Sequence, residues 1–304
     1  MANRLDVTAA PPVLDYSSYL LEARRHLSAD TKTATRIAPS LDRAAAGSEN
    51  ALWWPAFDSC PGASSACAGR LHTGNPSDSV ACYAWRLEQP RKALRDLARW
   101  RWERFHELDA LDAAALAVAI ARTTWQGQVD RGVTRPLLRL SASGDLDAAT
   151  ARAWGTALRN PAVLELDELD DKLDGLTVWT YTRSYGAVAR NAAAAFLDAD
   201  GRPPPRTTLY LSTDRSMLER TQRALAGLFH RCPVAVLADT LEDGRAQLVE
   251  LGRGDRRRIP CPVDTGRMPL VVTPRRRPAS GACAHCRACA PPTATAPDII
   301  FLRR

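Results

Sequence analysis

Short apolar runs alternate with helical patterns through the middle of the chain. Four such runs are "PLLRLSASGDL" from Pro136, "LTVWTYTRSYG" from Leu176, "TTLYLSTDRSM" from Thr207 and "CPVAVLAD" from Cys232. Runs of this length, rich in apolar and β-branched residues, are typical of buried strands, and amphipathic helical patterns follow the first and third. The alternation predicts an α/β fold with a parallel sheet, in the form of a partial or complete (β/α) barrel.

The segments on either side of this core differ in character. "ALWWPAF" from Ala51 predicts a strand leading into a cysteine loop, and a helical pattern runs from Pro90 to about Ala121. We therefore expect an N-terminal extension over residues 1–50, a barrel-like core over 51–255 and a cysteine-rich, cluster-binding segment over 256–304.

Polar residues cluster where the predicted strands end. In parallel α/β folds the carboxyl ends of the strands carry the chemistry, because loops from separate strands converge there. We expect catalytic or ligand-contacting roles for Asp145, Arg183, Asp214 and Arg215, and cofactor contacts from Ser143, Gly144, Asp145, Thr182, Ser184 and Thr213. The alternative for each of these residues is a helix cap or a turn.

Three cysteines stand at intervals of three residues near the end of the sequence. Cys283, Cys286 and Cys289 form C-x2-C-x2-C, and "IPCPVD" upstream offers Cys261, followed by proline, as a fourth ligand. This spacing matches the cysteine run of ferredoxin-type 4Fe-4S clusters. Zinc, bound by four cysteines or by three with His285, is the alternative.

A second cysteine group follows the first predicted strand. Cys60, Cys67 and Cys82 have no evident fourth partner, so they could hold a cluster with one iron left open to a small molecule. Cys232 is the spare candidate for a fourth ligand, but because it stands at the start of an apolar run it is interpreted as structural. The sequence therefore predicts one or two 4Fe-4S clusters.

The charge and composition of the chain limit the kinds of partner that it is expected to bind. The chain has a formal net charge of +7, which comes mostly from arginine because Lys32, Lys92 and Lys172 are its only lysines. That bias reflects either genome composition or an anionic partner such as nucleic acid. We expect a cytoplasmic protein without a signal peptide or membrane span, in which clustered thiols bind metal more often than they pair.

The order of parts resembles radical S-adenosylmethionine enzymes. A three-cysteine loop after a first strand is followed by a helix and then by a strand ending in Ser-Gly-Asp. The resemblance implies that Cys60, Cys67 and Cys82 bind a cluster, that Gly144 and Asp145 contact the methionine amine of S-adenosylmethionine, and that an external electron donor is needed. The wide cysteine spacing departs from the tight C-x3-C-x2-C of those enzymes.

A second resemblance covers roughly residues 30 to 304. It rests on "TKTATRIAPSL", "CPGASSAC" with "CYAW", "SASGDL", "VWTYTRS", "LSTDR", "CPVDTG" before the cysteine run, and the closing "IIFLRR". In this order the motifs resemble the gene product 88 domain family of phages and mobile elements. The insertion "GRLHTGNPSDSVA" between the first cysteines is a departure from that family.

Two functions remain open from the sequence. One is a radical-SAM-like iron-sulfur enzyme of unknown substrate. The other is a nucleic-acid-binding or replication-associated protein whose zinc or iron-sulfur sites hold the fold together. His26, His72, His106, His230 and His285 are all isolated, which argues against a nuclease that needs a metal-binding histidine pair.

Overall fold

An eight-stranded sheet organises the fold. Its strands, in chain order, are β1 (Ser28–Ala29), β2 (Glu49–Trp53), β3 (Leu137–Ser143), β4 (Thr177–Thr182), β5 (Thr207–Asp214), β6 (Val234–Ala238), β7 (Arg258–Pro260) and β10 (Asp298–Leu302). The computed structural model describes residues 14–29, 49–56, 58–60, 63, 88, 90–167, 173–186, 192–272, 280–290 and 296–302. Across the sheet the order is β1-β2-β3-β4-β5-β6-β10-β7, so the last strand in the sequence is inserted beside β6.

Helices connect most of the strands. They are α1 (Leu20–His26), α5 (Lys92–Glu107), α6 (Ala110–Val129), α7 (Ala148–Ala157), α8 (Pro161–Leu164), α9 (Leu218–Ala226), α10 (Leu241–Glu250) and α11 (Ala282–Cys286). Short 3-10 turns are η1 (Ser17–Tyr19), η2 (Glu165–Asp167), η4 (Ala192–Phe196) and η5 (Arg215–Met217). A separate two-stranded sheet pairs β8 (Val271–Val272) with β9 (Ser280–Gly281).

The predicted α/β fold with a parallel sheet is confirmed. Strands β2 to β7 and β10 pair in parallel, and only β1 joins its neighbour in the antiparallel sense among the strands described. The expected barrel is not seen, because β1 and β7 lie at opposite ends of the strand order and no pairing joins them within the described residues. The sheet is therefore open.

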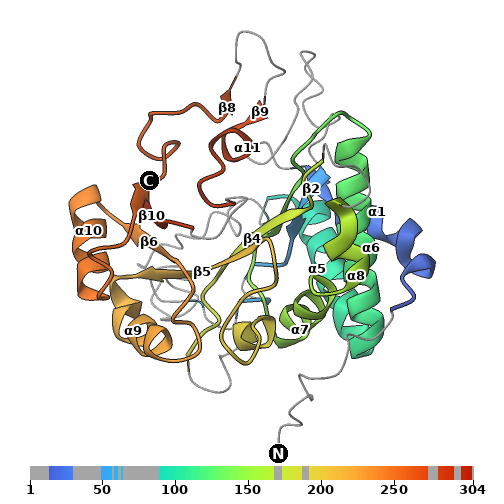
Figure 1. The fold of residues 1–304 in the computed structure, drawn as a ribbon, viewed down its shortest axis with the longest axis horizontal. Coiled ribbons are helices and arrows are strands. Elements are labelled where there is room, and N and C mark those ends of the chain that lie inside the picture. The colour runs from blue at the N-terminus through green and yellow to red at the C-terminus, as the bar shows by residue number, and fades with distance from the viewer. Residues whose placement is uncertain are drawn as a thin grey trace, which may run out of the picture.

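The two faces of the sheet are covered by different parts of the chain. Val178 and Leu209 lie in a buried cluster with residues of α6 and α7, whereas Trp179 and Tyr210 lie in clusters with residues of the cysteine-rich segment. This alternation follows from the two-residue period of a strand. Figure 1 shows α7 and α9 below the sheet, and β8, β9 and α11 above it.

The middle of helix α6 is apolar on all sides, and it lies inside the helical layer. Every residue from Ala113 to Ala121 is buried, and the helix packs against α1, α7 and α8. Asp109 begins it, with a carboxylate oxygen that accepts hydrogen bonds from the N–H groups of Leu111 and Asp112, both at 2.9 Å. Among the described helices, none combines the length and apolar character needed to cross a bilayer.

Candidate functional site

The cysteines of the C-terminal segment gather at one place. Cys261 directly follows β7, Cys283 and Cys286 lie on α11, and Cys289 follows three residues later. All four line one cavity of about 30 Å³. Arg287, with φ of 53°, turns the chain after α11, so that Cys289 returns to the same cavity.

This cavity rests on the face of the sheet opposite the main helices. Trp179 of β4, Ile259 of β7 and Ile299 of β10 line it together with the thiols. Burial raises the pKa of Cys289, and the neighbouring thiol of Cys283 raises it further. Ionising this thiol is therefore unfavourable unless a cation lies beside it, which is the role a thiolate-bound metal performs.

The ligand geometry of a metal site is not already formed. In the part of the chain that the structure describes, no three His, Cys, Asp or Glu side chains are arranged to hold a metal ion. The four thiols thus share a cavity without converging on one point. The sequence predicted cysteine-rich metal-binding loops, and such loops are not evident in this arrangement.

The other cysteines lie elsewhere. Cys60 is half-buried beside the end of β3, while Cys67 and Cys82 of the same predicted group lie outside the described residues. Cys232 is buried in the cluster on the helical face, and burial raises its pKa to about 12. The structure therefore separates Cys232 from the cysteine-lined cavity.

Asp145 occupies the centre of a polar network at the strand ends. Its side chain is buried, and one carboxylate oxygen accepts a hydrogen bond from the N–H of Leu146 at 2.6 Å. The other oxygen accepts from the N–H of Arg183 at 2.7 Å and from Ser184 Oγ at 2.9 Å. Burial raises the pKa of Asp145, and these bonds oppose the rise. The residue thus ties the end of β3 to the end of β4.

Arg183 extends the network to β5. Its Nη1 lies 2.5 Å from Oδ2 of the fully buried Asp214 and 3.0 Å from the sulfur of Met217. The other oxygen of Asp214 accepts from the N–H of Ser216 at 2.9 Å, which starts the turn after β5. Arg220 of α9 donates to the Arg183 carbonyl at 3.1 Å. The ends of three neighbouring strands are therefore connected through side chains.

The predicted threonines support this network from within. Thr182 Oγ1 accepts a hydrogen bond from the N–H of Ser184 at 3.0 Å. Thr213 Oγ1 lies 2.7 Å from Oγ1 of Thr221 on α9. Both threonines are buried, so in this structure they hold the strand ends together.

Arg215 and Ser143, which were also predicted as site residues, are not part of the hydrogen-bond network around Asp145 that is described above. Arg215 pairs with Asp243 and Glu250 of α10, and its side chain is 56% exposed. It therefore points to the outer surface near α10 and does not join the contacts of Asp145. Ser143 is the last residue of β3.

Gly144 brings the first cysteine segment against the end of β3. Its φ is +69°, and a Cβ at this position would lie 2.3 Å from Ser59 Oγ and 2.7 Å from Trp54 Cβ. Ser59 Oγ donates to the carbonyl of Pro55 at 2.8 Å and accepts from the N–H of Asp145 at 3.2 Å. Cys60, the next residue, is therefore held beside the strand-end network.

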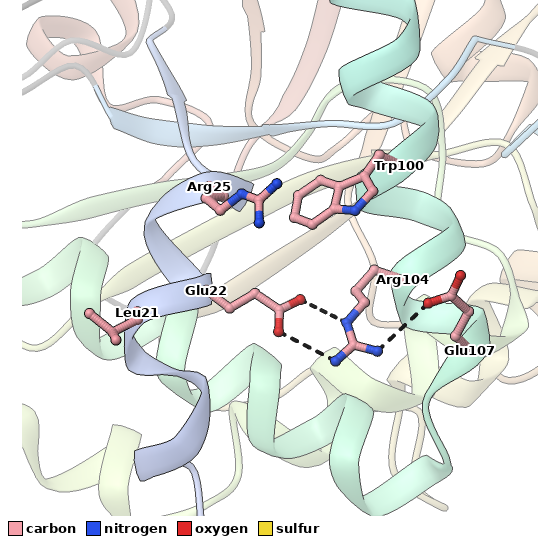
Figure 2. Close-up of a pocket in the computed structure, with 6 residues that line it drawn as sticks. All are labelled: Leu21, Glu22, Arg25, Trp100, Arg104 and Glu107. Atoms are coloured by element: carbon pink, nitrogen blue, oxygen red, sulfur yellow. Dashed lines mark hydrogen bonds and ion pairs between the residues drawn. The ribbon is translucent and has the colours of Figure 1, made fainter.

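A larger, open groove lies between α1 and α5. Its volume is about 470 Å³, and Figure 2 shows Arg104 between Glu22 and Glu107 on its wall. Arg104 Nε is 2.8 Å from Glu22 Oε1, and Nη1 is 3.6 Å from Glu107 Oε2. The Arg25 guanidinium lies 4.4 Å above the ring of Trp100. Because these groups pair with one another, the groove provides no assembled set of reactive groups.

Two features at the sheet were not predicted from the sequence. Burial raises the pKa of Tyr181 well above its usual value and the neighbouring thiol of Cys289 raises it further, whereas the alternation of its strand indicated only that every second residue shares a face. Asp298 is fully buried and forms a bidentate ion pair with Arg253, with Nε–Oδ2 at 2.8 Å and Nη2–Oδ1 at 2.9 Å. No local pattern signals a pair separated by 45 residues.

Fold and site together define an open α/β protein with a thiol-lined cavity on one sheet face and a polar network at its strand ends. The chain belongs to the gene product 88 family, whose model matches residues 20–292. It is also similar to the gene 88 protein of Mycobacterium phage D29, with 25% identity over 232 residues that cover 76% of this chain and 78% of the phage protein. Solved structures give no significant match.

Proposed function

We propose that the protein is a phage-type iron-sulfur protein in which Cys261, Cys283, Cys286 and Cys289 hold a 4Fe-4S cluster. The observation that carries the proposal is that these four cysteines, from two separate segments, line one cavity. An all-sulfur donor set suits an iron-sulfur cluster or zinc, whereas carboxylate-binding cations need oxygen donors.

The size of the cavity bears on the choice of metal. The space of about 30 Å³ accommodates one small ion, so a four-iron cluster would need the cysteine side chains and their loops to rearrange around it. Metal binding and folding are coupled in such sites, because the ligands reach their final geometry only around the metal. The spacing of the cysteines and the proline after Cys261 favour the cluster, and the small cavity favours zinc.

A second cluster at Cys60, Cys67 and Cys82 would make the protein radical-SAM-like. The supporting observation is that Ser59 and Gly144 hold Cys60 beside the carboxyl ends of the strands. Three thiolate ligands would leave a cluster with one iron open to S-adenosylmethionine, and an external donor would supply the electron. Asp145 then acts by fixing the strand ends, since its oxygens already accept protein hydrogen bonds.

Metal identity tests the proposal. Protein purified without oxygen is expected to be brown, with broad absorption near ~400 nm from a thiolate-bound cluster. S-adenosylmethionine should then alter the paramagnetic resonance spectrum of the reduced protein if the open cluster is present. Colourless protein with stoichiometric zinc would contradict the iron-sulfur proposal and favour the nucleic-acid-binding alternative, which gel-shift assays over a range of salt concentrations would test.

A further inference from the structure

We propose that arginines at the amino ends of β6, β10 and β7 form a surface that binds the phosphate backbone of double-stranded DNA. This arginine cluster consists of Arg231, Arg256, Arg257 and Arg258. All are exposed except Arg256, whose side chain is 35% exposed. None of the four lines the cavity of the cysteines, so the inference does not depend on which metal that cavity holds.

Parallel pairing brings the amino ends of these three strands side by side. Asp298, the first residue of β10, is in register with Arg258 of β7, and its N–H donates to the carbonyl of Arg257 at 2.9 Å. On the other side of β10, Asp298 Oδ1 accepts from the N–H of Val234, which begins β6, at 2.8 Å. The chain segments that lead into β6 and β7 therefore meet at the same end of the sheet.

A buried ion pair holds the two arginine-bearing segments against this end of the sheet. Arg253 donates to both oxygens of Asp298 and, through Nη2, to the carbonyl of Cys232 at 3.1 Å. Arg231 directly precedes Cys232, so it lies beside the turn that carries Arg256. The backbone of the cluster is thus fixed before a ligand binds, which lowers the entropic cost of binding.

Carboxylates do not balance the positive charge at this end of the sheet. Residues 230–234 and 251–258, together with Asp298, contain five arginines and two aspartates. Asp298 is fully buried and pairs with Arg253, so it is not accessible to the exposed arginines. In the described ranges, no ion pair to a carboxylate is made by Arg231, Arg257 or Arg258. The exposed guanidinium groups therefore have donors available for an anionic partner.

The chemistry of the arginine cluster fits the backbone of a duplex. A guanidinium group can donate two parallel hydrogen bonds to a phosphate, and neighbouring arginines can contact successive phosphates. Surfaces that bind single strands also stack bases on aromatic side chains. Neither 230–234 nor 251–258 contains Phe, Tyr or Trp. We therefore expect binding that is independent of base sequence and strongly dependent on salt.

The test is binding of a fluorescent DNA duplex to the purified chain, measured by fluorescence anisotropy over a range of salt concentrations. Each arginine–phosphate contact contributes about 0.9 to the slope of log K against log salt. Arg257→Gln/Arg258→Gln should therefore weaken binding and make this slope shallower by about 2. Arg231→Gln, in the other segment, should make it shallower by about 1.

Lys92→Gln/Arg99→Gln is the matched control. Both residues are exposed on α5, where they pair with Asp96 and Asp58. This variant loses the same positive charge as the double substitution in the arginine cluster, so an effect of net charge alone would appear equally in both. The control should keep the affinity and salt slope of the unsubstituted chain. Thermal unfolding of each variant checks that the fold is retained.

Several outcomes would overturn the inference. They are a lack of duplex binding by the unsubstituted chain, an equal loss of binding in the control and the cluster variants, and tighter binding of a single strand than of the duplex. Binding to vesicles containing phosphatidylglycerol without binding to the duplex would assign the arginines to a membrane surface instead. If Arg257→Gln/Arg258→Gln unfolds, the salt slope of Arg231→Gln decides. None of these measurements reports on iron, so the iron-sulfur proposal holds or fails separately.

Discussion

Replacing Gly144 with alanine tests the close approach of the Cys60 segment to the end of β3. The new Cβ would lie 2.3 Å from Ser59 Oγ and 2.7 Å from Trp54 Cβ, far inside the ~3.5 Å of an ordinary carbon contact. Relieving this overlap requires backbone movement and should cost about 1–3 kcal/mol, as overpacking does. The left-handed backbone, with φ of +69°, adds about 1–2 kcal/mol for a residue with a side chain.

Gly252 separates the two contributions. Its φ is +70°, and an added Cβ would meet nothing within 4 Å, so Gly252→Ala carries the backbone cost alone. Thermal unfolding followed by circular dichroism should place the midpoint of Gly144→Ala about 2–6 °C below that of Gly252→Ala. Equal midpoints for the two variants would refute the close packing of Trp54 and Ser59 against Gly144.

Two further predictions concern stability. Asp298→Ala leaves the Arg253 guanidinium buried without its carboxylate, so it should lower the free energy of unfolding by about 3–5 kcal/mol in chemical denaturation. Alanine at the exposed Asp200 is the control and should change that free energy by under about 0.5 kcal/mol. Similar losses in the two variants would contradict the role of the buried Arg253–Asp298 ion pair. The hydrogen bond to Asp147 raises the pKa of His106 in the folded protein. The His106–Asp147 pair therefore contributes its whole stabilisation below the pKa of histidine in the unfolded chain, about 6.5, and loses it as the pH rises through the pKa of His106 in the folded protein. The stability difference between the unsubstituted chain and His106→Gln should therefore shrink between pH 6 and pH 9, and a constant difference would refute this role.

Local sequence predicted the central strands because each is a continuous apolar run. The runs from Pro136, Leu176, Thr207 and Cys232 became β3, β4, β5 and β6. The insertion of β10 between β6 and β7 could not be predicted in this way. Contacts distant in sequence fix it, among them Asp298, whose Oδ1 accepts from the N–H of Val234 at the start of β6.

Part of the candidate site could also be predicted from local sequence patterns, whereas the part that depends on contacts distant in sequence could not. Spacing identified the cysteines around the cavity, and the strand-end rule identified Asp145 and Arg183. The sequence did not reveal that Asp145 is buried and already hydrogen-bonded, because burial depends on how β3 and β4 pack. It also placed Arg215 among the site residues, although the surface pair with Asp243 directs it toward α10.

The central claim is that the cysteines around the cavity bind an iron-sulfur cluster, and iron and sulfide analysis of two cysteine variants tests it most directly. Cys283→Ala removes a thiol from the cavity, while Cys232→Ala removes a buried thiol on the opposite face of the sheet. Compared with the unsubstituted chain, Cys283→Ala should lose about four irons and four sulfides, and Cys232→Ala should lose none. Iron content that is the same in both variants, or zinc in place of iron, would contradict the account.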